Sequence, residues 1–105
     1  MEPYKIIIYD KAIEDMEGIY TYISETLYAP VAAMNQYNRI ADAILSLEQM
    51  PERVHLMYSE PERSKGIRSL PVDNYAVFFI IDGNTVNVIR VLYGASDICK
   101  RLLEE

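Results

Sequence analysis

The most constraining feature of this sequence is the run at residues 75–81 (Tyr-Ala-Val-Phe-Phe-Ile-Ile), which contains only aromatic and aliphatic side chains. A short run this apolar predicts a β-strand buried at the centre of a sheet, because a half-exposed strand alternates with polar residues. Asp82-Gly83-Asn84 follows, and these residues tolerate the positive φ angles of a hairpin turn. Residues 85–93 then largely alternate in polarity, which predicts the next strand of the sheet.

Two further segments have the composition of strands. Residues 4–9 form a short run rich in β-branched and aromatic side chains, and residues 67–72, after Gly66, have a similar strand-like composition. Pro71 predicts that the second of these is an edge strand, because proline has no backbone N–H to offer a neighbouring strand.

Two helical patterns lie between residues 10 and 50. The first begins at Asp10, which we predict to be the N-cap, and continues for about 17 residues. Pro30 ends this pattern and opens the second, which Pro51 ends. Two helices of similar length joined by a short turn predict an antiparallel hairpin. The predicted apolar faces are Ile13, Met16, Tyr20, Ile23 and Leu27 in the first helix, and Met34, Tyr37, Ala41 and Ile44 in the second, flanked by Ala33, Ile40 and Leu47.

The remaining segments complete the predicted order of elements. Residues 51–66 have no regular period and predict a long loop with a short element near residues 54–58. Residues 97–105 predict a short amphipathic helix. We therefore expect one α+β domain over residues 1–105: an N-terminal strand and an antiparallel helical hairpin packed on a mainly antiparallel β-sheet, with a short C-terminal helix.

Composition excludes several classes of function. The formal net charge of −6 argues against a simple electrostatic nucleic-acid binder. The lone Cys99 and lone His55 rule out a disulfide framework and a Cys- or His-rich metal site, so we expect neither metal nor cofactor. The chain has no apolar run of membrane-spanning length and no signal-peptide pattern at its start. We expect a cytoplasmic protein that does not enter a membrane.

Arg68 is the first candidate for chemistry, because it lies where the long loop meets a strand. A guanidinium group can hold a phosphate or a carboxylate through two hydrogen bonds. The structural alternative is an ion pair with Glu60, Glu62 or Asp97.

Arg90 and Tyr93 form the second candidate, at the end of the last strand. Their spacing places them on opposite faces of a regular strand, so a joint site requires a bulge between them. Arg90 is flanked by apolar residues, so an inward-facing guanidinium needs an acidic partner. The structural alternative is therefore an ion pair.

His55, Glu60 and Glu62 form the third candidate, in the long loop. Imidazole and carboxyl groups can act as general acids or bases near neutral pH when their surroundings shift their pKa values. A single histidine in a loop is more often an ordinary surface residue.

Taken in order, these residues resemble a known family. The segment Gly66-Ile-Arg68-Ser-Leu-Pro-Val-Asp-Asn74-Tyr75-Ala-Val-Phe-Phe, followed by Val88-Ile-Arg90-Val-Leu-Tyr93-Gly94-x-x-Asp97, resembles the RelE/ParE superfamily of toxins from type II toxin–antitoxin systems. The resemblance extends over nearly the whole chain. It implies a small bacterial toxin that a cognate antitoxin neutralises. RelE-like members cleave mRNA in the ribosomal A site without a metal, whereas ParE-like members poison DNA gyrase.

In the nuclease interpretation, the resemblance assigns catalysis to Arg68, Arg90 and Tyr93, and Glu60 or Glu62 could match an acidic residue seen in some nucleases. His55 is a candidate acid or base from its residue type alone. Many relatives carry basic residues after the Tyr-Gly pair, where this chain has Ala95 and Ser96. We therefore expect a ParE-like toxin that binds DNA gyrase or another protein. The alternatives are a RelE-like endoribonuclease whose target is the ribosome with its mRNA, and a degenerate toxin that only binds antitoxin.

The expected partner is the cognate antitoxin, which we predict to lie along the strand that contains Arg68 and along the C-terminal tail. The assembly is expected to be a homodimer or a toxin–antitoxin hetero-oligomer.

Overall fold

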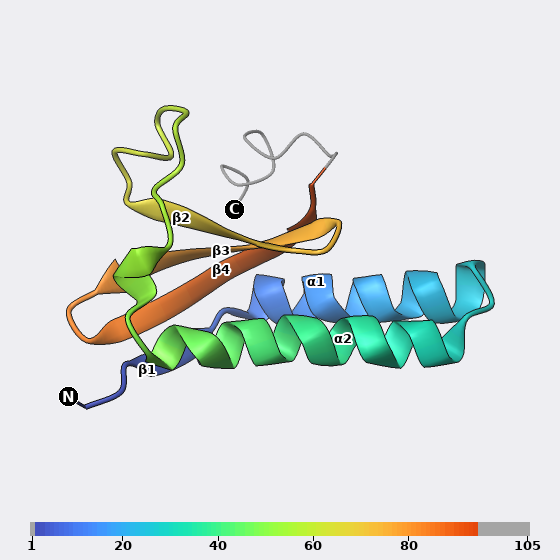
Figure 1. The fold of residues 1–105 in the computed structure, drawn as a ribbon. Coiled ribbons are helices and arrows are strands. Elements are labelled where there is room, and N and C mark those ends of the chain that lie inside the picture. Colours follow the sequence, from blue (N-terminus) through green and yellow to red (C-terminus); the bar gives the residue numbers. More distant parts are fainter. Residues whose placement is uncertain (1, 95–105) are drawn as a thin grey trace.

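The apolar run at residues 75–81 lies inside a four-stranded sheet of order β1-β4-β3-β2 in the computed structural model of the chain (Figure 1). The structure describes residues 2–94. β3 is one of the two inner strands and β2 is an edge strand, so the prediction from the apolar run and the prediction from Pro71 are both confirmed. The strands are β1 (Lys5–Ile8), β2 (Ile67–Val72), β3 (Tyr75–Asp82) and β4 (Thr85–Tyr93).

The sheet is mixed. β2 pairs with β3 and β3 pairs with β4 in antiparallel fashion, as predicted, whereas β1 lies parallel to β4 with Ile8 opposite Val88. A β-bulge interrupts the β3–β4 ladder, because Phe78 lies opposite Arg90 while Phe79 lies opposite Val88. The bulge lies before Arg90 and changes which face of β4 the following residues occupy.

The predicted helical hairpin is confirmed. Helix α1 (Asp10–Thr21) continues into a π-helical turn (Tyr22–Thr26), and helix α2 (Pro30–Leu45) continues into a short 3-10 turn (Ser46–Glu48). The prediction of Asp10 as N-cap is wrong. Tyr9 holds that position in an extended conformation, because its N–H still bonds to the Val88 carbonyl at 2.9 Å, and Asp10 is the first helical residue.

The predicted apolar faces of the helices are confirmed in part. Met16 of the first stripe and Ile44 of the second are buried, as are the flanking Ala33, Ile40 and Leu47. Ile13 and Met34, however, are 42% and 48% exposed, and Ala12, outside the predicted stripe, is inaccessible to solvent. Its small side chain lets α1 approach its neighbours closely, and a pattern based on large apolar residues does not register that effect.

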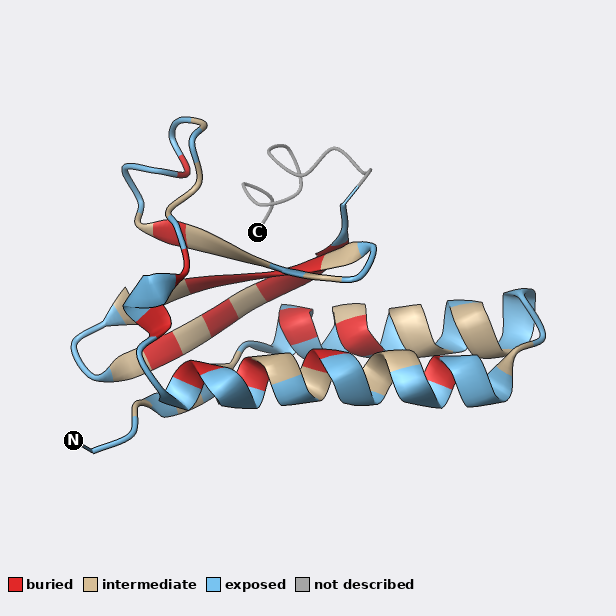
Figure 2. Ribbon diagram, viewed as in Figure 1, coloured by how far each residue is buried: buried red, intermediate tan, exposed pale blue. Residues whose placement is uncertain are grey.

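The helices cover one face of the sheet (Figure 2), and buried residues of both helices belong to one core with residues of the sheet. This main core contains Phe79, Val77 and Val91 from the sheet. A smaller cluster with Phe78 and Leu92 lies on the opposite face.

The loop predicted at residues 51–66 begins with a 3-10 turn (Pro51–Arg53) and contains an isolated bridge from Leu56 to Arg68, which agrees with the short element predicted there. The predicted C-terminal helix at residues 97–105 lies outside the described residues. Within residues 2–94, no helix has both the length and the apolar character needed to span a bilayer.

Candidate functional site

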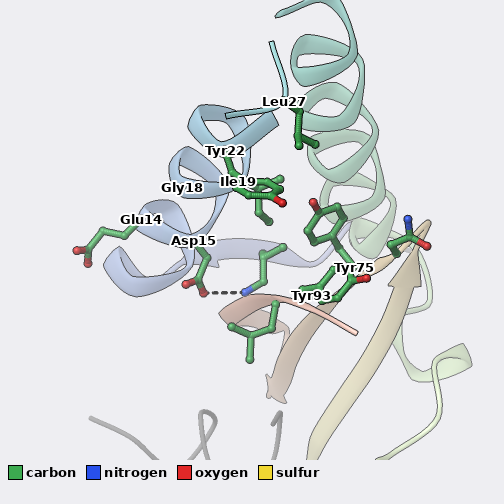
Figure 3. Close-up of a pocket in the computed structure, with 11 residues that line it drawn as sticks. Glu14, Asp15, Gly18, Ile19, Tyr22, Leu27, Tyr75 and Tyr93 are labelled. Atoms are coloured by element: carbon green, nitrogen blue, oxygen red, sulfur yellow. Dashed lines mark hydrogen bonds between the residues drawn. The ribbon is translucent and has the colours of Figure 1, made fainter. Parts of the chain in front are cut away.

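A groove of about 680 Å³ opens between the end of α1, the π-helical turn and the ends of β3 and β4 (Figure 3). Three tyrosines from separate elements converge on it: Tyr22 from the π-helical turn, Tyr75 from β3 and Tyr93 from β4. Leu27 closes its upper side in Figure 3. We call this feature the tyrosine groove.

Sheet register places two of these rings together. Tyr75 and Tyr93 are opposite each other in the β3–β4 ladder, and their rings meet edge to face with centroids 5.7 Å apart. The Gly94 N–H bonds to the Asn74 carbonyl at 2.8 Å and closes this end of the strand pair. Gly18 contributes to the opposite wall, where a Cβ would meet no atom within 4 Å. The groove therefore has an aromatic floor and an open wall.

The described residues that line the tyrosine groove offer hydroxyl groups and apolar surface, but no positive charge. Burial, together with the neighbouring Tyr22 and Tyr93, raises the pKa of Tyr75, so its hydroxyl stays neutral at physiological pH. Among the described residues that line the groove there is no Lys, Arg or His, whereas Glu14 and Asp15 are acidic. The groove suits an apolar or hydrogen-bonding group of a partner better than it suits a phosphate.

Arg90 has the acidic partner that its apolar flanks predict, and the partner is Asp15 of α1. Arg90 Nε and Nη2 donate to Oδ2 and Oδ1 of Asp15 at 2.7 and 2.9 Å, and the two side chains are only 9% and 11% exposed. The Val91 backbone N–H donates to the same carboxylate at 3.0 Å. β1 pairs with β4 only as far as Val88, so Asp15 takes the place of a strand neighbour beyond that point.

Arg68 makes different contacts from those considered in the sequence. Its Nη1 donates to the backbone carbonyls of Val54 at 2.6 Å and Glu52 at 3.3 Å. No hydrogen bond or ion pair with Glu60 or Glu62 is found within the described part of the chain, and Asp97 lies outside it. Arg68 therefore ties the 3-10 turn and the chain after it to the first residues of β2.

The three residues assigned to the nuclease interpretation do not form one cluster. The ladder from Arg90 to Tyr93 is regular, so these two residues lie on opposite faces of β4. Arg68 is opposite Phe79, whereas Tyr93 is aligned through Tyr75 with Val72, four residues farther along β2. A strand rises about 3.3 Å per residue, so these four residues separate Arg68 from the position aligned with Tyr93 by about 13 Å along the strand. Their proposed joint role in catalysis remains a prediction.

The third candidate, His55 with Glu60 and Glu62, does not form one cluster either, because each residue has different surroundings. His55 is exposed and lines a second cavity of about 700 Å³ beside β2. Glu60 accepts the Ser64 N–H at 2.9 Å, and its contacts with Ser64 lower its pKa. Glu62 is fully buried and accepts a 2.5 Å hydrogen bond from Ser59, while its Oε2 has no hydrogen-bond partner among the described residues. The described residues contain no group of three or more side chains arranged to hold a metal ion.

Sequence patterns did not single out Asp15, Tyr22 or Leu27 as site residues, and Tyr75 entered only through the strand run and the family resemblance. Asp15 looked like an ordinary acidic residue in the first part of a helix, where it favours the positive end of the helix dipole. Tyr22 falls outside the predicted apolar stripe, and Leu27 was assigned to its buried end although it is 53% exposed. Leu27 could have indicated the site from sequence, because a large apolar residue at the exposed end of a helix often contacts a partner.

Comparison with known proteins agrees with the fold and identifies a family. The family model described as "ParE toxin of type II toxin-antitoxin system, parDE" matches residues 6–98. A search of curated protein sequences gave no match.

Three solved structures share the architecture. The chromosomal ParDE system of P. aeruginosa aligns with a TM-score of 0.72 and 22% identity, over 86% of this chain and 95% of that chain. The RelBE2 toxin–antitoxin complex of Mycobacterium tuberculosis gives 0.61 and 20%, over 87% and 98%. YafQ from E. coli strain BL21(DE3) gives 0.52 and 12%, over 88% and 94%. At these identities the likeness to solved structures establishes the fold.

Proposed function

The chain belongs to the ParE toxin family of type II toxin–antitoxin systems, and from this premise we propose that it arrests growth by binding DNA gyrase as a protein inhibitor. The observation that carries the proposal is the absence of cationic side chains from the tyrosine groove, as far as the described residues line it. A nuclease must stabilise charge that develops on a phosphate, and a toxin that works on the ribosome must dock on polyanionic RNA. Without a cationic side chain in its described lining, the groove is poorly suited to either role.

The position of Arg90 supports the same proposal. In the nuclease interpretation its guanidinium contacts the phosphate, but here Nε and Nη2 are directed at Asp15 in a pair that is about nine-tenths buried. If Arg90 turned to a substrate, the Asp15 carboxylate would lose both guanidinium hydrogen bonds and would keep only the one from the Val91 N–H. This cost favours a structural role for Arg90.

For the antitoxin we propose binding along β2. β2 is an edge strand, and an extended peptide can add to such an edge through backbone hydrogen bonds. The second cavity lies beside this strand and is lined by Leu70, Pro71, Met57 and Tyr58, which offer apolar contacts to side chains of an added strand. ParDE and RelBE2 are both named as toxin–antitoxin systems, which supports an antitoxin partner for this chain.

The test combines a gyrase assay with a map of RNA ends. Purified protein is added to purified bacterial DNA gyrase, and supercoiling of a relaxed plasmid is measured. We expect supercoiling to fall as the protein concentration rises. In parallel, RNA 5′ ends are mapped across the genome shortly after the chain is induced without an antitoxin, and we expect growth arrest with no new ends inside codons.

Tyr93→Phe separates the two mechanisms because it removes one hydroxyl and keeps the ring against Tyr75. We expect it to remain an inhibitor of gyrase. Tyr9→Phe, at another exposed tyrosine outside the groove, is the matched control. New RNA ends that vanish in Tyr93→Phe but persist in Tyr9→Phe would establish the RelE-like alternative. Unaffected growth and unaffected gyrase would establish the degenerate toxin.

A further inference from the structure

The turn that joins the two helices exposes a group of apolar side chains at the far end of the hairpin. Leu27 is 53% exposed, Tyr28 is 88% exposed and Val31 is 73% exposed. We call these three residues the hairpin tip. In Figure 1 the hairpin reaches beyond the sheet, and in Figure 2 its turn is solvent-exposed. Exposed aromatic and branched side chains gathered at one projecting end are a frequent mark of a binding surface.

We propose that the hairpin tip is the surface that docks on gyrase, with the Tyr28 ring entering an apolar pocket on a positively charged face of that enzyme. This inference rests on the proposed function, because it names the part of the toxin that recognises the same target. Three observations on the chain support it: backbone strain at Tyr28, the charge of the hairpin, and continuity with the tyrosine groove.

The backbone around the tip is irregular in two places. The last turn of the first helix is π-helical over Tyr22–Thr26, and Tyr28 has φ 53°, in the left-handed region that favours glycine and asparagine. Pro30 contributes to this path, because it disfavours the helical conformation at Ala29, whose φ is −129°. This strained backbone conformation does not bury the Tyr28 ring, which is almost fully exposed. A strained conformation that leaves a large aromatic ring in water points to a binding role.

The charge of the hairpin determines which partner fits. Residues 12–38 contain four acidic residues, Glu14, Asp15, Glu17 and Glu25, and no Lys, Arg or His. Asp15 is paired with Arg90, and Glu25, in the π-helical turn beside the tip, is the acidic residue close enough to set the sign of the field there. A second copy of this chain would bring another acidic hairpin, and a nucleic acid would bring phosphates, so both are repelled. A protein surface with positive charge around an apolar pocket is complementary.

The hairpin tip is also continuous with the tyrosine groove. Leu27 belongs to both, and Tyr22 of the π-helical turn lines the groove directly beside it. A partner seated on the tip therefore reaches the groove without crossing a charged barrier, since Glu14 and Asp15 lie at the opposite end of the same wall in Figure 3. Gyrase side chains next to the Tyr28 pocket would fill the space that Gly18 leaves open.

The test uses Tyr28→Asn, because asparagine adopts left-handed φ values readily and so keeps the turn while removing the ring. Met50→Asn is the matched control: Met50 also has a left-handed φ, of 47°, and is 65% exposed, but it lies at the other end of α2. Urea unfolding of each variant verifies that the fold is intact.

Binding of each full-length variant to purified gyrase holoenzyme is measured by biolayer interferometry, and growth arrest is measured in cells. We expect Tyr28→Asn to weaken gyrase binding by at least about tenfold, as the loss of a central aromatic contact does, and to abolish growth arrest. Met50→Asn should stay within about twofold of the parent. Glu25→Lys should also weaken binding, and more strongly at low salt than at high salt.

The outcomes separate this inference from the function on which it rests. If the parent binds gyrase and a folded Tyr28→Asn binds equally well, the hairpin tip is not the docking surface, while the proposed function stands. If the parent arrests growth without binding gyrase, the proposed function fails, and docking of gyrase at the tip fails with it. Loss of arrest in Tyr28→Asn would then assign the tip to a different protein target. A parent that neither binds gyrase nor arrests growth overturns both.

Discussion

Replacing Asp15 with alanine removes three hydrogen bonds that join the first helix to the last strand. The carboxylate accepts from Arg90 Nε, Arg90 Nη2 and the Val91 N–H, at 2.7, 2.9 and 3.0 Å. Arg90 is 8% exposed as a residue, so its guanidinium remains close to buried when the carboxylate is lost. We expect Asp15→Ala to be among the most destabilising single changes on the surface of this chain.

The magnitude follows from the burial of the pair. Breaking a buried ion pair by removing one partner costs about 3–5 kcal/mol, because a charge is left without compensation. Asp15 and Val91 line the tyrosine groove, so water can enter the space that the lost carboxylate leaves, and we expect a value near 3 kcal/mol. A domain of this size is stable by about 5–15 kcal/mol, so the loss is a large fraction. It corresponds to a fall in Tm of at least about 12 °C at about 4 °C per kcal/mol.

Urea unfolding followed by circular dichroism measures this difference, with two-state fits of the free energy of unfolding for each variant. Asp15→Asn keeps one oxygen for the Val91 N–H and should lose about half as much. Glu17→Ala, on an exposed position of the same helix, is the control and should change stability by less than about 0.5 kcal/mol.

A double-mutant cycle tests whether the pair itself is responsible. Asp15→Ala combined with Arg90→Met removes both charges, and the loss should be smaller than the sum of the two single losses by at least about 1 kcal/mol. An Asp15→Ala variant that loses less than about 1 kcal/mol would refute the argument, because it would mean that the guanidinium reaches water without cost. If the prediction holds, loss of toxicity in any Arg90 variant must be corrected for loss of folded protein.

Two further predictions concern ionisation. Tyr75→Phe should remove an alkaline-shifted component from the tyrosine absorbance titration, because burial raises the pKa of Tyr75; loss of an ordinary, unshifted component instead would contradict this assignment. Glu60→Gln should lower the urea midpoint more at pH 7 than at pH 3. The pKa of folded Glu60 is lowered from 4.5, so its stabilising contribution is present above that pH and is lost as pH falls through the folded value. An equal difference at both pH values would contradict this assignment.

Much of the fold was accessible from local patterns. The apolar run at residues 75–81 indicated a central strand, Pro71 indicated the edge strand, and Pro30 with Pro51 delimited two helices of a hairpin. Each of these inferences depends on a property of a few consecutive residues, such as hydropathy period or a missing N–H. The burial of Ala12 and the exposure of Ile13 and Met34 were missed, because they depend on how closely each helix approaches its neighbours. The parallel pairing of β1 with β4 was missed because it joins the two ends of the described chain.

In the candidate site, the difference between what the sequence determines and what tertiary packing determines is larger than in the fold. The sequence by itself determined that Arg90 needs an acidic partner, that the first half of the chain is acidic, and that the chain resembles a family of toxins. Only the tertiary structure decided that the partner is Asp15, 75 residues away, and that Arg68 and Tyr93 lie far apart on the sheet. A sequence pattern records which groups need partners, because that need follows from charge and burial. Which groups meet depends on strand register, a bulge and the approach of a helix, and these arise only when distant segments pack together.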